Sequence, residues 1–224
     1  MGEAIGEVLP MAVVVALGPI PIIAVVLILV TPRARSNGPA FVLGWLVALA
    51  ILGVILLAIA GPTDASDDGR PAEWVGWLML VLGVLLVLVA VRQWRSRPHE
   101  GEEVATPKWM GAIDSFTPGR ALGAGALLGV NPKNLLLAVA AAAAIAQTGI
   151  PGSEQAIAYA VFALIGTIGV GAPVVTFFVL GERSREMLDG LKTWMSRNNT
   201  AIMAVLCLVI GAKLIGDAIG ALSS

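Results

Sequence analysis

The sequence predicts an all-α integral membrane protein with six transmembrane helices. Three observations lead to this prediction: the composition is strongly apolar, six apolar segments are long enough to cross a bilayer, and proline-containing interruptions fall inside the first and the fourth of these segments. The paired interruptions further predict a 3+3 inverted repeat with the broken helices 1 and 4 at its centre, an arrangement that many transporters use.

Composition excludes most other classes of protein. Of the 224 residues, 58% are hydrophobic and 13% are charged, and the mean hydropathy is +0.90; soluble domains carry about 25% charged residues. The net charge of −1 provides no attraction for nucleic acids. A single cysteine, Cys207, and a single histidine, His99, cannot assemble a disulfide framework, a metal cluster or a His-based catalytic triad. We therefore expect no enzyme activity, no catalytic residue, no metal, no cofactor and no nucleic-acid partner.

The six apolar segments define the domain organisation. A helix needs about 20 apolar residues to cross roughly 30 Å of hydrocarbon. The segments that meet this requirement lie near 5–31, 38–60, 73–94, 119–146, 155–180 and 198–220. They predict a first three-helix repeat over 1–94, a loop over 95–118 and a second three-helix repeat over 119–224.

Basic residues predict the orientation in the membrane. Cytoplasmic loops of membrane proteins carry an excess of Lys and Arg. Eleven basic residues fall in the three loops on one side, and Arg70 alone falls on the other. The eleven are Arg33, Arg35, Arg92, Arg95, Arg97, Lys108, Arg120, Arg183, Arg185, Lys192 and Arg197. We therefore expect a multi-pass protein of the cytoplasmic membrane with both termini outside.

Two of these cytoplasmic loops have a helical pattern of apolar residues. Trp109, Ile113 and Phe116 share one helix face in the loop over 95–118, and Leu191 and Trp194 continue such a face near 182–197. Amphipathic helices of this kind lie in the membrane interface. We expect both to be elbows that anchor the adjoining spans.

Proline and glycine interrupt the first and fourth spans at corresponding places. Gly18, Pro19 and Pro21 break the first span, and Pro132 breaks the fourth. Proline has no amide hydrogen and clashes with the preceding turn, so each span should consist of two half-helices. The amino ends of the second halves, which carry partial positive charge, should point towards the middle of the bilayer.

The repeat also predicts which other residues correspond. A shift of 113 residues sets Pro19 against Pro132, and it also sets Gly53 against Gly166 in the second helix of each unit. Paired interruptions of this kind mark a binding site at the repeat interface. Small residues four apart predict close helix packing; these pairs are Gly119 with Gly123, Gly125 with Gly129, and Gly216 with Gly220.

Lys133 is the strongest candidate for a functional side chain. A lysine deep in a membrane is costly and usually faces a cavity or a pathway. Its neighbours Asn131 and Asn134 can donate and accept hydrogen bonds. Together with the two half-helix amino ends, these groups would suit a carboxylate, phosphate or sulfate. The expected binding site therefore comprises the two breaks, with Gly18, Pro19, Pro21, Asn131, Pro132, Lys133 and Asn134.

For the other polar residues of the spans and loops, two roles are open: coupling of transport to protons, or support of the structure. Lys213 and Asp217 are four residues apart on span 6, so they can pair with each other, although Asp217 could also titrate in a proton-coupled cycle. Asp114 could cap span 4 or hold the elbow. Glu7 is expected to be a solvated end of span 1.

Several of these motifs together resemble a known family. The Gly-Pro break in span 1, the loop motif Ile113-Asp114-Ser115-Phe116-Thr117-Pro118 and the stretch Val130-Asn131-Pro132-Lys133-Asn134-Leu135 look like the glycopeptidolipid-addressing (Gap) and sulfolipid-addressing (Sap) proteins. These actinobacterial membrane proteins belong to the lysine-exporter superfamily. The resemblance implies transport of cell-envelope glycolipids or related amphiphiles towards the surface, with membrane lipids as ligands. It also implies cooperation with a large lipid exporter of the resistance-nodulation-division class.

Two other functions stay open at this stage. One is export of small polar solutes, such as amino acids or cations, as elsewhere in the superfamily. The other is an accessory subunit of a larger lipid exporter, with no substrate of its own. The oligomeric state, including a homodimer, also stays open.

The predicted orientation can be tested by cysteine labelling. In Asp67→Cys and Gly152→Cys variants, a membrane-impermeant thiol reagent added outside intact cells should react with the new cysteine, because both positions lie on the acidic side of the membrane. A Gly101→Cys variant should not react, and the native Cys207, inside span 6, should react slowly. Labelling of Gly101→Cys from outside would reverse the topology.

Overall fold

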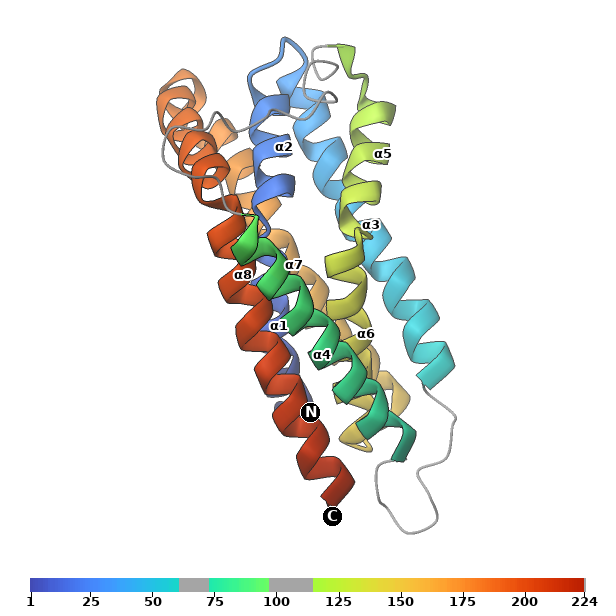
Figure 1. Ribbon diagram of the computed structural model, residues 1–224. Coiled ribbons are helices and arrows are strands. Elements are labelled where there is room, and N and C mark those ends of the chain that lie inside the picture. The colour runs from blue at the N-terminus through green and yellow to red at the C-terminus, as the bar shows by residue number, and fades with distance from the viewer. Residues whose placement is uncertain (61–72, 97–114, 224) are drawn as a thin grey trace.

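The computed structural model describes residues 1–60, 73–96 and 115–223, and the described elements are all helical (Figure 1). The elements in order are α1 (Gly2–Ala16), α2 (Pro19–Leu29), α3 (Ala34–Ala60), α4 (Glu73–Arg95), α5 (Pro118–Gly129), α6 (Pro132–Gln147), α7 (Gly152–Leu180), the 3-10 turn η2 (Gly181–Arg183) and α8 (Ser184–Ser223).

The helices have the lengths and composition of a multi-pass membrane protein. α3, α4, α7 and α8 are each long and apolar enough to cross a bilayer. α1 with α2 forms a bent pair at 51°, and α5 with α6 forms another at 59°. Counting each bent pair as one span gives up to six spans, which agrees with the sequence prediction.

Both breaks occur where proline predicts them. α1 ends at Ala16 and α2 begins at Pro19, while α5 ends at Gly129 and α6 begins at Pro132. Each proline takes the first helical position, where the missing amide hydrogen has no intrahelical acceptor in any case. The prolines therefore start new half-helices and do not distort continuous ones.

Three helix pairs form the main contacts of the bundle. α1 packs against α7, α3 against α5, and α4 against α8. α3 also contacts α7, while α2 contacts both α7 and α8. Both termini lie at the same end of the molecule, at the bottom of Figure 1.

Glycines allow the backbones of these pairs to meet. A Cβ added at Gly169 of α7 would lie 1.7 Å from the Ala16 carbonyl oxygen of α1. A Cβ at Gly125 of α5 would lie 2.0 Å from the Phe41 oxygen of α3. Neither position can hold a side chain unless the helices separate.

The predicted pairs of small residues differ in their surroundings. Gly125 and Gly129 both pack against α3, as predicted. At Gly119, Gly123, Gly216 and Gly220, an added Cβ would meet no described atom within 4 Å. For these two pairs the prediction of close packing is wrong in the part of the chain that the structure describes. These glycines lie on helix faces that meet no described neighbour.

The two predicted elbows have different outcomes. The segment from 184 onward is helical, but it continues without a break into the last span as the 40-residue helix α8. Leu191 and Trp194 therefore belong to the same helix as span 6, not to a separate elbow. Most of the other elbow, including Trp109, Ile113 and Asp114, lies outside the described residues.

The close contact between α1 and α7 predicts unequal effects of two substitutions on one helix. Gly169→Ala should lower the free energy of unfolding by about 1–3 kcal/mol, as overpacking does, because the new methyl group would overlap the Ala16 oxygen. Gly171→Ala is the matched control, since a Cβ there meets no described atom within 4 Å. Thermal unfolding of the purified variants measures the difference. Equal melting temperatures would contradict this close approach.

Candidate functional site

The two breaks line one cavity, called here the break cavity, with a volume of about 340 Å³. Residues of both breaks form one part of its wall, and α4 and α8 form another part. The break residues in the lining are Gly18, Pro19, Ile20, Pro21, Asn131, Pro132 and Lys133, and the others are Leu86, Val89, Gln93, Leu128, Leu136, Asn199 and Met203. Segments more than a hundred residues apart in the sequence therefore form a common site.

Lys133 joins the second break to the end of α1. Its Nζ donates a hydrogen bond to the carbonyl oxygen of Val14 at 3.0 Å. The same Nζ lies 3.0 Å from where a Cβ would stand at Gly18, so a larger residue at 18 would press on the amine. The last carbonyls of a helix have no intrahelical donors and carry partial negative charge. Lys133 therefore caps α1 and still borders the cavity.

The break cavity has a simple electrostatic character. Among the described residues that line it, Lys133 has the one charged side chain, and no lining residue is acidic. An ammonium group has three donors, and one of them is used by Val14. Two donors are left for a ligand, so the cavity is suited to an anionic group.

Asn131 and Asn134 serve the backbone of the break. The Asn131 Oδ1 accepts from the Asn134 N–H at 3.1 Å, and the Asn131 Nδ2 donates to the Leu128 oxygen at 2.5 Å. The Asn134 Nδ2 donates to the Leu128 and Gly129 oxygens, both at 3.2 Å, and Asn134 is fully buried. Asn131 lines the cavity but Asn134 does not. Both amides therefore replace hydrogen bonds that the broken helix lacks.

The amino ends of α2 and α6 offer few donors to a ligand. First-turn N–H groups of a helix lack intrahelical acceptors, but Pro19, Pro21 and Pro132 have no amide hydrogen. Asn131 already caps the N–H of Asn134. The backbone N–H groups of Ile20 and Lys133 are the remaining first-turn donors at these ends, so the Lys133 side chain is the strongest donor that the cavity offers to an anion.

Two polar lining residues were missed by the sequence analysis. Gln93 of α4 and Asn199 of α8 both border the break cavity, and the Asn199 Oδ1 is buried without a hydrogen-bond partner among the described residues. Both are uncharged and stand near the ends of spans 3 and 6. A search for uncharged amides near span ends would have found them.

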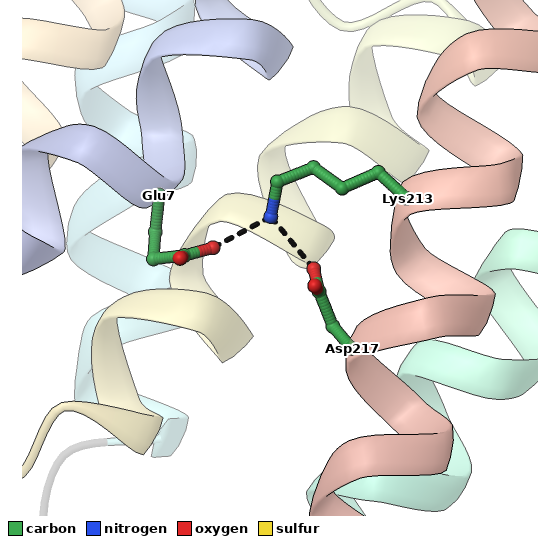
Figure 2. A network of polar contacts seen from close by, with 3 residues as sticks. All are labelled: Glu7, Lys213 and Asp217. Carbon is green, nitrogen blue, oxygen red and sulfur yellow. Dashed lines mark hydrogen bonds and ion pairs between the residues drawn. The ribbon is translucent and has the colours of Figure 1, made fainter.

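A second polar cluster, called here the ion triad, lies apart from the break cavity. The Lys213 Nζ stands 2.6 Å from the Glu7 Oε2 and 2.6 Å from the Asp217 Oδ2. Figure 2 shows the lysine nitrogen between the two carboxylates, with Glu7 on α1 and the other two residues on α8. The predicted pairing of Lys213 with Asp217 is present. The prediction that Glu7 is only a solvated end is wrong, because Glu7 is bonded to Lys213 of a distant helix. The remaining candidate, Asp114, lies outside the described residues.

Comparison with known proteins gives one match. The family described as Sap, sulfolipid-1-addressing protein, matches residues 8–220, which include both breaks and the ion triad residues Lys213 and Asp217. Neither the curated proteins nor the solved structures contain a match to the chain.

The hydrogen bonds of Asn134 predict a stability effect. Asn134→Ala should lower the free energy of unfolding by about 1–3 kcal/mol, because the buried bond to the Gly129 oxygen is lost and the Leu128 oxygen keeps only the Asn131 donor. Asn198→Ala is the control: it removes one solvent-exposed hydrogen bond of α8 and should change stability much less. Thermal unfolding in detergent compares the two. An Asn134→Ala variant as stable as the parent would contradict the supporting role of this amide.

Proposed function

The chain belongs to the family of Sap, the sulfolipid-1-addressing protein, and from this premise we propose that it is a transporter of anionic amphiphiles. Its substrates are cell-envelope glycolipids or related lipids that carry an acidic group. It moves them across the cytoplasmic membrane towards the surface, without enzyme activity and without a cofactor.

The observation that carries this proposal is a single cation in an otherwise uncharged, mainly apolar cavity. A carboxylate, phosphate or sulfate bound at Lys133 would use the two donors that Val14 leaves free. Leu86, Val89 and Leu136 provide apolar wall next to it. This combination fits a molecule with an acidic head and a hydrocarbon tail.

The size of the cavity limits how much of a lipid it encloses. A volume of about 340 Å³ is at the lower end of the range for small-molecule sites. The acidic group and the adjoining part of the molecule lie inside, and the long chains stay in the surrounding bilayer. The protein thus needs to shield only the polar part from hydrocarbon during transfer.

An inverted repeat explains why both breaks face the same cavity. In such a repeat α1 corresponds to α5, α3 to α7 and α4 to α8. The α1–α7 pair then corresponds to the α5–α3 pair, and the α4–α8 pair corresponds to itself, in agreement with the observed contacts. Gly83 and Gly211 support the same correspondence, because a Cβ on either would lie 2.9 Å from the carbonyl oxygen of the other. We propose a 3+3 inverted repeat with both termini outside, which suits alternating access.

Two other functions are less favoured by the cavity. An exporter of small amino acids or cations would need more polar side chains, and for cations an acidic one, than the described lining contains. An accessory subunit that assists a resistance-nodulation-division exporter would need no ligand at Lys133. Cooperation with such an exporter is compatible with transport by the chain itself, as is assembly into a homodimer.

Lipid binding to the purified full chain tests the proposal. The protein should bind the anionic lipid dioleoylphosphatidic acid more tightly than dioleoylphosphatidylcholine. Lys133→Ala should weaken binding of the anionic lipid about 10-fold or more, the effect expected for loss of a hydrogen bond to a charged group. Lys133→Arg should retain part of the affinity, because the charge persists with a different geometry. Lys192→Ala, which removes a lysine that does not line the cavity, should bind as the parent does.

Cellular phenotypes separate the three functions. Loss of the protein should deplete a surface-extractable anionic lipid and leave it inside the cell, and Lys133→Ala should reproduce this defect. A solute exporter would instead change resistance to an amino acid or a metal ion. An accessory subunit would give the lipid defect on deletion but tolerate Lys133→Ala. Normal lipid binding and normal transport by Lys133→Ala would refute the anion site.

A further inference from the structure

The ion triad lies between the break cavity and the end of the molecule that holds both termini. Glu7 precedes Val14, the acceptor of Lys133, by seven residues of α1, a distance of about 10 Å along the helix. Lys213 follows the cavity residue Met203 by ten residues of α8, or about 15 Å. On α1 the triad thus lies nearer the N-terminus than the cavity does, and on α8 it lies nearer the C-terminus. Both termini lie at the bottom of Figure 1.

The triad also connects two helix pairs that are each held together elsewhere. α1 is fastened to α7 by the backbone contact at Gly169 and by the ion pair of the Met1 amino group with Glu154 at 3.4 Å. α8 is fastened to α4 by the contact between Gly83 and Gly211. α1 and α8 themselves contact each other only slightly. The boundary between these two helices, called here the α1–α8 seam, is therefore loosely packed, while α2 contacts α8 beyond the break.

On the terminal side of the triad, α8 presents glycines. Gly220 lies seven residues after Lys213, on the same face of α8. A Cβ added at Gly220, or at Gly216 between them, would meet no described atom within 4 Å. The ion pair between Glu7 and Lys213 crosses the seam on this side of the cavity.

From this geometry we propose that Glu7, Lys213 and Asp217 form a gate for transport, closed in this structure. The Glu7–Lys213 pair holds the α1–α8 seam shut, and its release lets the break cavity open towards the side of the membrane on which the termini lie. The inference rests on the proposed transport function and adds to it the residues that control access.

The third member of the triad makes the gate releasable. An unpaired lysine in a membrane span is costly, but Asp217 is on the same helix as Lys213 and stays paired with it when α1 moves away. Glu7 has a side chain that is 39% exposed, so water can solvate it after release. After opening, Lys213 is therefore still paired with Asp217 and Glu7 is solvated by water. Neither charge is left without a partner in hydrocarbon.

This division of roles predicts opposite effects of two similar substitutions. Glu7→Gln removes the charge that crosses the seam, so it favours the open state. Asp217→Asn leaves Lys213 with Glu7 as its one charged partner in the triad, so it favours the closed state. If the triad only stabilised the fold, both substitutions would loosen the seam in the same direction.

Accessibility of a cysteine in the cavity measures the effect. The parent for this test carries Cys207→Ala and the reporter Leu136→Cys, and a membrane-impermeant methanethiosulfonate is added from the side of the termini. Glu7→Gln should raise the labelling rate about five-fold, the effect expected for loss of a partly exposed ion pair, and Asp217→Asn should lower it. The control Asp189→Asn breaks another ion pair of α8 and should leave the rate unchanged. Changes in the same direction, or no change in either variant, would overturn the gate.

Cross-linking tests the gate in a folded protein with a second readout. In a Glu7→Cys, Lys213→Cys double variant of the Cys207→Ala protein, a short, reducible bifunctional methanethiosulfonate should stop lipid transport, and a reductant should restore it. Binding of dioleoylphosphatidic acid should persist in the cross-linked state. Transport at the uncross-linked rate would overturn the gate. Failure of the anion site would instead appear as normal binding by Lys133→Ala, a result that the labelling test of the gate does not depend on.

Discussion

The hydrogen bond from the Lys133 Nζ to the Val14 oxygen connects the two halves of the structure. It places the positive charge at the start of α6 on the carbonyl end of α1, so the second broken helix completes the end of the first. The bond spans 119 residues of sequence. Because the lysine reaches α1 at its break, both interruptions border one cavity and do not remain as two separate kinks.

Broken helices inside a membrane require other groups to complete their backbone hydrogen bonds. At the second break Asn131 and Asn134 provide these bonds, and at the end of α1 Lys133 does so. The candidate site therefore combines support of the backbone with a charged donor in neighbouring residues. The two asparagines hold the shape of the break, which leaves Lys133 with donors for an anion.

The packing around this site divides the molecule into tight and loose boundaries. Glycines allow backbone contact within the α1–α7, α3–α5 and α4–α8 pairs. Between α1 and α8, by contrast, an ion pair carries the connection. Nothing replaces a close backbone contact when two helices separate, while the members of an exposed ion pair can bind water instead of each other.

The sequence by itself determined the features that depend on local chemistry. Proline acts on its own turn, so Pro19 and Pro132 already marked where the half-helices begin, and the spacing of Lys213 and Asp217 already predicted their contact. Hydropathy located the spans, because crossing a bilayer depends on the composition of each segment alone. Contacts between distant segments were decided only by the tertiary structure. The partner of Lys133, the pairing of Glu7 with Lys213, the inward donors of Asn134 and the glycines that meet a neighbour all depend on which helix faces join. A sequence pattern specifies a helix face, but the packing of the whole bundle decides what that face meets.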